Sequence, residues 1–205
     1  DRPERFKLSD FDPAGTDGFD IDKDEARKIL AGRAKHLASL QERLYAQDKW
    51  AVLVILQGMD AAGKDSIVEH VLYGVNPMGC DVHAFKKPTS DDLDHDFLWR
   101  VAQRLPQRGR IGIFNRSHYE ECLVVRVHPE ILAQQKLPSR LVTRNIWKER
   151  FESIRGFERH LVRNGTVVLK FPLRISRDEQ RKRFLARPDD PKKRWKFKMG
   201  DVAKR

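Results

Sequence analysis

A glycine-rich segment between a buried strand and a helix constrains this chain more than any other feature. The segment Gly58-Met-Asp-Ala-Ala-Gly63-Lys64 has the spacing G-x-x-x-x-G-K. Residues 50–57 before it form a short, apolar, β-branched run that is typical of a strand buried on both faces. Residues 65–73 after it have a helical pattern. In this context the motif predicts a loop whose main-chain amides bind phosphate at the positive end of a helix, with Lys64 as an added positive charge.

The remaining apolar runs alternate with helical patterns, and this alternation predicts the fold class. Strands are expected over residues 81–85, 110–114 and 166–171, and helices over 24–46, 91–105, 118–127 and 139–163. Strands joined by helices of this length need crossover connections, which give a parallel, doubly wound α/β sheet that binds ligands beyond the carboxyl ends of its strands. With 205 residues and no linker, the chain is expected to form a single domain over 1–205, with 1–21 as an extended arm.

Two carboxylates distinguish the glycine-rich segment from an ordinary phosphate-binding loop. Asp65 stands after the lysine, where such loops place the Ser or Thr that binds Mg²⁺, and Asp60 lies inside the loop. An acid there repels phosphate unless a metal ion lies between them. We therefore expect Asp60 to bind a metal ion or to activate the acceptor as a base, and Asp65 either to join the phosphate site or to cap the helix. The predicted phosphate-binding residues of this region are Gly58, Ala61, Ala62, Gly63, Lys64 and Asp65.

Polar residues directly follow the third expected strand, so they should face the same cleft as the loop. Arg116 can bind a phosphate with two parallel hydrogen bonds, and the side-chain oxygen of Asn115 can position a water molecule or Mg²⁺. Ser117 is expected to cap the next helix rather than to act as a nucleophile, and His118 to be an ordinary polar residue at its start. Phosphoryl transfer requires positioning and charge neutralisation, so it needs no covalent intermediate.

The net charge of +11 predicts attraction to a polyanion, and most of the excess lies near the C-terminus. Residues 174–198 hold eleven Lys or Arg and four acidic residues. Ser176 and Glu179 fit a capping box that begins a short helix, on which Arg183 and Arg187 share one face. This segment is predicted to close over phosphates as a basic lid, and a solvated charged face is the alternative. The chain shows neither a signal peptide nor an apolar run of membrane-helix length, so we expect a cytoplasmic protein.

Five segments carry a family resemblance: GMDAAGKD at 58–65, GVNPMGCDVHAFKKPT at 74–89, LDHDFLWR at 93–100, IFNRSHYEECLVVRVHPE at 113–130 and DDPKKRWKF at 189–197. Together they resemble the second polyphosphate kinase family, whose fold is like that of thymidylate kinase. It implies a three-layer P-loop kinase fold with a central parallel sheet and a basic helical lid. It also implies reversible phosphoryl transfer between inorganic polyphosphate and nucleotides that depends on Mg²⁺, with Mn²⁺ as an alternative ion.

Site residues carry over from the resemblance position by position. Asp60, Lys64, Arg116 and the lid residue Arg183 are the expected catalytic residues, and Asp60 and Asn115 the expected metal ligands. Glu120 and Glu121 resemble the acidic pair of the subgroup that accepts nucleoside monophosphates as well as diphosphates. With Asn115 they form the expected acceptor site for AMP, ADP and GDP, and ATP is the nucleotide formed from ADP. The expected basic channel for polyphosphate is lined by Lys86, Lys87, Arg126 and Arg187.

The sequence leaves two other functions open. A nucleoside monophosphate kinase with ATP as donor would share the fold, but it would not need so basic a lid or an acid after the loop lysine. A nucleic-acid-binding module could use the basic C-terminal segment, but beyond Trp195 and Phe197 few aromatic residues accompany the charges, so no nucleic acid is expected as partner. We expect the chain to form a homo-oligomer, either a dimer or a tetramer. We expect no association with a membrane.

Overall fold

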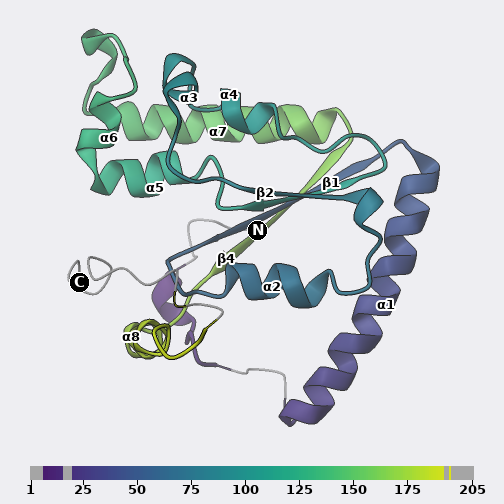
Figure 1. Cartoon of the computed structure of the whole chain (residues 1–205). Coiled ribbons are helices and arrows are strands. Elements are labelled where there is room, and N and C mark those ends of the chain that lie inside the picture. The colour runs from purple at the N-terminus through teal and green to yellow at the C-terminus, as the bar shows by residue number, and fades with distance from the viewer. Residues whose placement is uncertain (1–6, 16–19, 192–193, 195–205) are drawn as a thin grey trace.

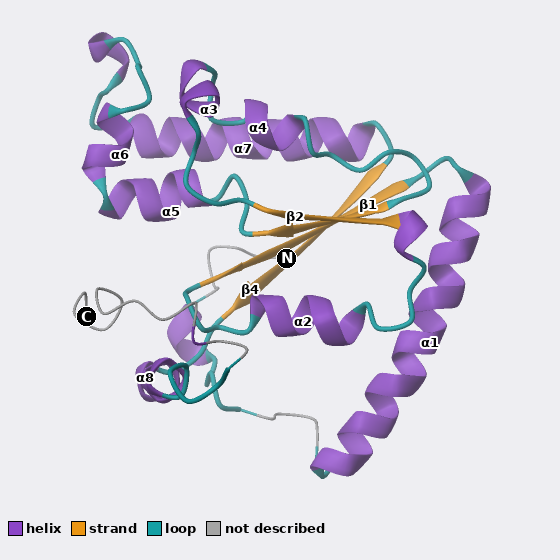
Figure 2. Ribbon diagram, viewed as in Figure 1, coloured by secondary structure: helices purple, strands orange, loops and turns teal. Residues whose placement is uncertain are grey.

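Four parallel strands form the central sheet of the computed structural model, which describes residues 7–15, 20–191 and 194. The strands are β1 (Ala51–Gly58), β2 (Cys80–Ala84), β3 (Ile111–Asn115) and β4 (Thr166–Leu173), in the order β2-β3-β1-β4. Because every pairing is parallel, the carboxyl ends of all four strands lie at one edge of the sheet (Figure 2). The chain leaves β1 towards β2 on one side and later reaches β4 on the other. The crevice between the ends of β1 and β3 is thus the place where such sheets bind ligands.

Helices cover both faces of the sheet (Figure 1). One face carries α3 (Ser90–Asp94), α4 (Trp99–Ala102), α5 (Glu120–Val127), α6 (Pro129–Ala133) and α7 (Ile146–Arg163). The other face carries α2 (Lys64–Val71), while the long α1 (Lys23–Gln47) lies beside it and α8 (Arg177–Leu185) follows β4. Short 3-10 turns occupy Leu8–Asp10, Pro77–Gly79 and Ser139–Leu141. The expected three-layer α/β fold with a central parallel sheet is confirmed.

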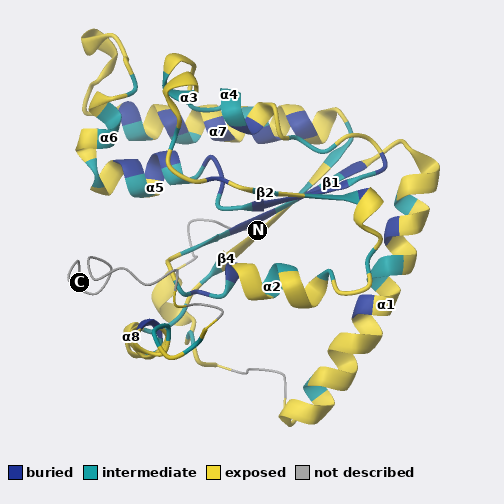
Figure 3. Cartoon of the chain, viewed as in Figure 1, coloured by how far each residue is buried: buried dark blue, intermediate teal, exposed yellow. Residues whose placement is uncertain are grey.

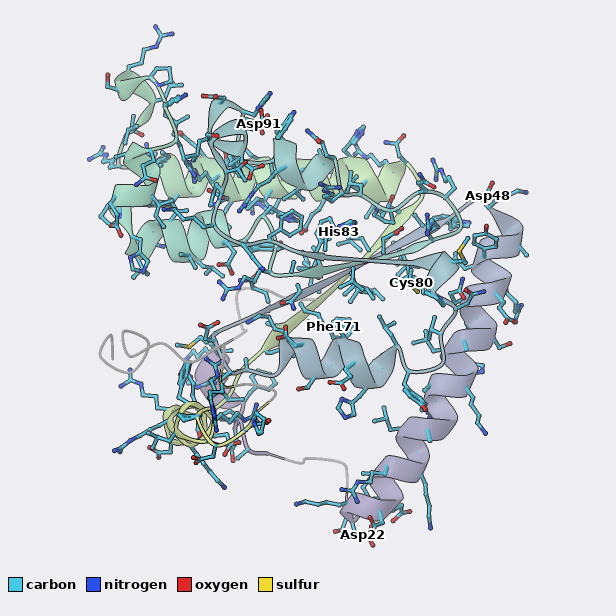
Figure 4. All side chains as sticks on the ribbon, in the orientation of Figure 1. Asp22, Asp48, Cys80, His83, Asp91 and Phe171 are labelled. Carbon is cyan, nitrogen blue, oxygen red and sulfur yellow. The ribbon has the colours of Figure 1, made fainter. Side chains whose placement is uncertain are left out.

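Alternating residues of the strands build a separate core on each face of the sheet. Leu53, Ile55 and Phe114 pack with Val101 and Leu161 on the side of α4 and α7. Leu56, Ile111 and Ile113 pack on the opposite side, where α2 contributes partly buried apolar residues. Figure 3 shows β1 as mostly buried and α1 as mostly exposed. His83 and Phe171 mark the two faces, since Figure 4 shows them on opposite sides of the sheet.

The structure agrees with the expected strands and with the first helix to within two residues at each end. Asp22 caps the start of α1, because its carboxylate accepts hydrogen bonds from the main-chain N–H groups of Asp24 and Glu25. Within the arm predicted over 1–21, the 3-10 turn Leu8–Asp10 is an added element. Arg174 ties this part of the arm to the end of β4, since its guanidinium donates to the main-chain oxygens of Leu8 and Phe11.

Three helices differ from the expectation, and in two of them a side chain binds the backbone at the point of difference. The helix expected over 91–105 is divided into α3 and α4, because His95 is extended and the carboxylate of Asp96 accepts the N–H of Leu98. The helix expected over 118–127 begins at Glu120, and the Ser117 hydroxyl accepts the N–H of Tyr119 ahead of it rather than capping it. The helix expected over 139–163 begins only at Ile146. Among the described residues, no helix combines the length and the apolar character needed to cross a membrane.

Candidate active site

The glycine-rich loop and the residues after β3 lie next to each other because β1 and β3 are paired strands. Leu56 of β1 is in register with Asn115 of β3, and the N–H of Arg116 donates to the Leu56 carbonyl at 3.0 Å. The loop 59–63 leaves β1 two residues later and leads into α2. Two chain segments that are more than fifty residues apart in sequence are thus joined at the β1/β3 crevice.

The loop has the tight conformation that its glycines predict. Gly63 has φ 100° and Ala61 has φ 65°, so the chain passes twice through the left-handed region before α2 begins. At Gly58 a Cβ atom would lie 2.7 Å from the main-chain oxygen of Leu173, so any side chain there would push β4 away. The glycine at this position is therefore required by the close approach of two strands.

Lys64 is buried at the start of α2 with its ammonium group folded back over the loop. Its Nζ donates to the main-chain oxygens of Gly58 at 2.6 Å and Met59 at 3.0 Å. Burial and the neighbouring Arg116 lower the pKa of Lys64, and nearby carboxylates, chiefly Asp60, oppose this shift. A cation of this kind, already partly removed from water, is well suited to binding an entering phosphate.

Arg116 is the centre of the charged cluster in the crevice. Its guanidinium binds the Asp60 carboxylate at 2.7 Å and the Glu120 carboxylate at 3.3 Å. Arg116 itself has φ 66°, a strained value for a residue with a side chain, which turns the chain sharply at the end of β3. Gln57 supports the cluster from β1, since its amide donates to Glu120 and accepts from the Ser117 hydroxyl.

Oxygen ligands suitable for a hard cation gather beside this cluster. The amide of Asn115 donates to the Asp65 carboxylate at 2.6 Å, while the Asp60 carboxylate is about half exposed on the loop. Among the described residues, no group of three or more His, Cys, Asp or Glu could hold a metal ion. The carboxylates of Asp60 and Asp65 and the side-chain amide of Asn115 are oxygen-bearing groups at this end of the sheet.

Helix α8 packs directly against the loop. The Gln180 amide donates to the main-chain oxygen of Asp60 at 2.8 Å, and the Arg183 guanidinium donates to that of Ala61 at 2.9 Å. Glu179 holds Arg183 from one helical turn away, at 2.7 Å. Ser176 caps α8 by accepting the N–H of Glu179, but the reciprocal bond of the expected capping box is replaced by the Glu179–Arg183 pair.

Two other predicted site residues lie against side chains outside this cluster. Glu121 is buried beside Arg150 and Arg100, at 3.2 and 3.5 Å. Arg187 stacks on the Phe184 ring of α8, with 4.4 Å from its guanidinium carbon to the ring centre. Neither side chain therefore joins Lys64 and Arg116 in this arrangement of the chain.

Three of the cations expected to bind polyphosphate are exposed side chains. Lys86 and Lys87 are exposed after β2, and Arg126 is exposed in the last turn of α5. Part of the basic lid segment predicted over 174–198 lies outside the described residues, namely 192–193 and 195–198.

Two residues of the site were not predicted from the sequence. Gln57 is the polar residue next to the end of an otherwise apolar strand, and its place before a glycine-rich loop is the only signal in the sequence. Gln180 lies four residues after the helix cap Ser176 and four before the buried Phe184, so it belongs to the inner face of α8. Nothing in the sequence shows that this face meets the loop, because that contact depends on the tertiary structure.

Comparison with known proteins agrees with this geometry. The family described as Polyphosphate kinase 2 (PPK2) matches residues 20–205. An ADP-polyphosphate phosphotransferase of Rhodopseudomonas palustris is 50% identical over 194 residues, which cover 94% of this chain and 67% of the relative. An AMP/ADP-polyphosphate phosphotransferase of Meiothermus ruber is 48% identical over 201 residues, covering 98% and 71%.

A solved structure supports the same assignment. The crystal structure of Polyphosphate Kinase 2 from Arthrobacter aurescens TC1 superposes with a TM-score of 0.87 at 40% identity. The match covers 97% of this chain and 68% of that one. Sequence and fold thus lead to one assignment: the chain belongs to the Polyphosphate kinase 2 family.

Proposed function

We propose that this chain transfers the terminal phosphoryl group of inorganic polyphosphate to ADP, with AMP as a second acceptor. Membership of the family makes it a polyphosphate:nucleotide phosphotransferase, and the names of the two relatives support these acceptors. The observation that carries the proposal is the meeting of the loop lysine Lys64 with Arg116 and Asp60 at the β1/β3 crevice. Two cations and a carboxylate at the end of a phosphate-binding loop suit the transfer of a highly charged group.

In the reaction, an oxygen of the acceptor's terminal phosphate forms a bond to the terminal phosphorus of polyphosphate. The bond from that phosphorus to the bridging oxygen breaks, so the polyphosphate leaves one unit shorter. Lys64 and Arg116 neutralise charge on the transferred group, and the Asp60 and Glu120 carboxylates orient the Arg116 guanidinium beforehand. Arg183 would add a further cation from α8 when it releases the loop carbonyl.

The family's kinases are typically metal-dependent, and we propose Mg²⁺ as the ion. Asp60 would hold it directly and Asn115 would contribute its side-chain oxygen, because both lie at the crevice. When bound, the ion neutralises phosphate charge and keeps the phosphates in place. Asp60, which already pairs with Arg116, would link this ion to the guanidinium.

The test is a turnover assay with purified protein and Mg²⁺, offering polyphosphate or ATP as donor and ADP, GDP or AMP as acceptor. We expect turnover of ADP with polyphosphate, and a loss of about a hundredfold or more in Lys64→Ala, because the lysine binds the transferred group rather than the core. Lys28→Ala, an exposed lysine of α1, is the matched control. Turnover of AMP with ATP but not with polyphosphate would instead identify a nucleoside monophosphate kinase. Full activity of a folded Lys64→Ala variant would contradict the assignment of the loop.

A further inference from the structure

The main-chain oxygens of the phosphate loop are held by side chains from two directions. Those of Gly58 and Met59 accept from Lys64, at 2.6 and 3.0 Å. Those of Asp60 and Ala61 accept from Gln180 and Arg183 of α8, at 2.8 and 2.9 Å. A loop that presents its amides to phosphate turns its carbonyls elsewhere, and each of these four carbonyls has a donor.

Three side chains donate to the four carbonyls, and two of these side chains are cations that have a second role. Under the proposed function Lys64 and Arg183 bind phosphate, so an entering polyphosphate competes with the loop for both of them. Gln180 differs, because its amide is neutral and its residue is only 4% exposed. Because Gln180 carries no net charge and is buried against the loop, a phosphate attracts it less than it attracts the two cations, and we expect Gln180 to stay on the loop when they leave it.

The carbonyl that Gln180 holds belongs to the residue where loop geometry matters most. Asp60 carries the carboxylate that orients Arg116 at 2.7 Å, and Ala61 after it has φ 65°. A left-handed residue with a side chain costs roughly 1–2 kcal/mol and persists only where its surroundings fix it. Fixing the Asp60 carbonyl therefore fixes the peptide plane that begins this strained turn, and with it the main-chain position from which the Asp60 side chain reaches Arg116.

The sequence of α8 explains how Gln180 reaches this position. Ser176 sets the first turn, and Gln180 and Phe184 follow at intervals of four residues, both buried, so they form the inner face of the helix. The helix thus anchors itself through Phe184 and presents the amide of Gln180 to the loop from one turn away.

We propose that Gln180 is a positioning residue that keeps the phosphate loop in its binding conformation while Lys64 and Arg183 engage the substrate. The proposal rests on the proposed function, since it assumes that the loop binds the transferred phosphate. It assigns to α8 a neutral contact with the loop in addition to the basic residues of the expected lid.

The experiment compares three variants of the full chain in the polyphosphate and ADP assay. Gln180→Met keeps the length and burial of the side chain but removes the donor, and Gln180→Glu places an acceptor against the Asp60 carbonyl. Leu185→Ala, on the exposed side of α8, is the control. We expect kcat to fall about tenfold in Gln180→Met, the effect of one lost hydrogen bond, and further in Gln180→Glu. In Gln180→Met the KM for ADP should stay at the wild-type value, the midpoint of thermal unfolding should fall by only the few degrees that one lost hydrogen bond causes, and Leu185→Ala should match the wild type.

The outcomes of this experiment test the role of Gln180 and the proposed function separately. A wild-type protein without polyphosphate-dependent turnover would overturn the proposed function and the inference together. An active wild type with an equally active Gln180→Met would overturn the inference alone. A Gln180→Met variant whose activity falls only in step with its unfolding midpoint would show that Gln180 merely anchors α8, which also contradicts the positioning role. If Gln180→Glu does not fold, Gln180→Met decides the question alone.

Discussion

Glu120 and Glu121 are neighbours in sequence, but their carboxylates lie in different surroundings. Adjacent helix positions point about 100° apart, so only one of the two can face the crevice. Glu120 binds Arg116 at 3.3 Å and accepts from Gln57, within the charged cluster. Glu121 is 2% exposed and pairs with Arg150, which is itself buried. The two residues should therefore respond to substitution in different ways.

Replacing Glu120 should change the choice of acceptor. A carboxylate beside Arg116 repels a diphosphate more than a monophosphate, and it can hold water or Mg²⁺ in the space that a shorter acceptor leaves empty. We expect Glu120→Asn to lower the rate of AMP phosphorylation by polyphosphate while largely sparing that of ADP. Steady-state rates with both acceptors measure this, and equal losses for both would mean that the glutamate only supports the fold or Arg116.

Replacing Glu121 should lower stability instead. Glu121→Gln leaves the Arg150 guanidinium in the interior without its counter-charge, and burial already lowers the pKa of Arg150. We expect the free energy of unfolding to fall by about 3 kcal/mol, as is usual when one partner of a buried pair is removed. Denaturant titration measures this, with the ratio of AMP to ADP turnover in the folded variant staying as in the wild type. A changed ratio at unchanged stability would place Glu121 in the acceptor site.

At this scale the sequence could predict the residues that belong to a local motif. The loop residues and the pair after β3 were predicted because their chemistry follows from spacing and from the end of a strand. The surroundings of Glu121, the buried side chain of His118 and the contacts of Gln57 and Gln180 were not, since each depends on a partner far away in the sequence.

At the scale of elements, one buried carboxylate joins α7, β4 and the start of α5. Glu158 of α7 accepts hydrogen bonds from Tyr119 at 2.8 Å and Lys170 at 2.6 Å, and lies 3.3 Å from the ring nitrogen of His118. Burial alone would raise its pKa, but these three hydrogen bonds, that of His118 most strongly, outweigh it and lower the pKa of Glu158 to about 2. His118, expected to be an ordinary polar residue, is thus a buried part of this connection.

The low pKa makes the stability of this connection depend on pH. Because the folded-state pKa lies below the ordinary value of 4.5, the contribution is complete above pH 4.5 and is lost as the pH falls towards 2. The difference between these two pKa values corresponds to about 3 kcal/mol in the free energy of unfolding. Denaturation curves between about pH 7 and pH 2.5 should show this loss in the wild type and less of it in Glu158→Gln. Parallel curves for the two proteins would contradict the depressed pKa.

The predictable elements were those with a strong period or an unbroken apolar run. The four strands and α1 have such patterns, so their bounds were predicted closely. The break between α3 and α4 arises from the Asp96 side chain binding the backbone, and the delayed start of α5 from the Ser117 hydroxyl binding the N–H of Tyr119. Such local competition for hydrogen bonds does not change the spacing of apolar residues, so the hydrophobic periodicity of the sequence does not reveal it.

At the scale of the whole molecule, net charge and topology act together. The charge is +11, and the parallel order of the strands puts the end of β2, followed by Lys86 and Lys87, at the same edge as the phosphate loop. Polyphosphate that extends away from the loop along this edge would pass cations in succession. The path itself remains a prediction, and the salt dependence of binding tests it.

Binding of long-chain polyphosphate should weaken steeply with salt, because each lysine or arginine that contacts the chain releases counterions from it. Removing two contacts should make the plot of log affinity against log salt less steep by about 1.5. We expect this change in the double variant Lys86→Gln, Lys87→Gln. The double variant Lys23→Gln, Lys28→Gln removes the same charge from the exposed start of α1 and should keep the wild-type slope. Binding titrations over a series of salt concentrations measure these slopes. Equal slopes for both double variants would mean that polyphosphate responds only to the net charge of the protein. A slope near zero in the wild type would contradict the basic channel altogether.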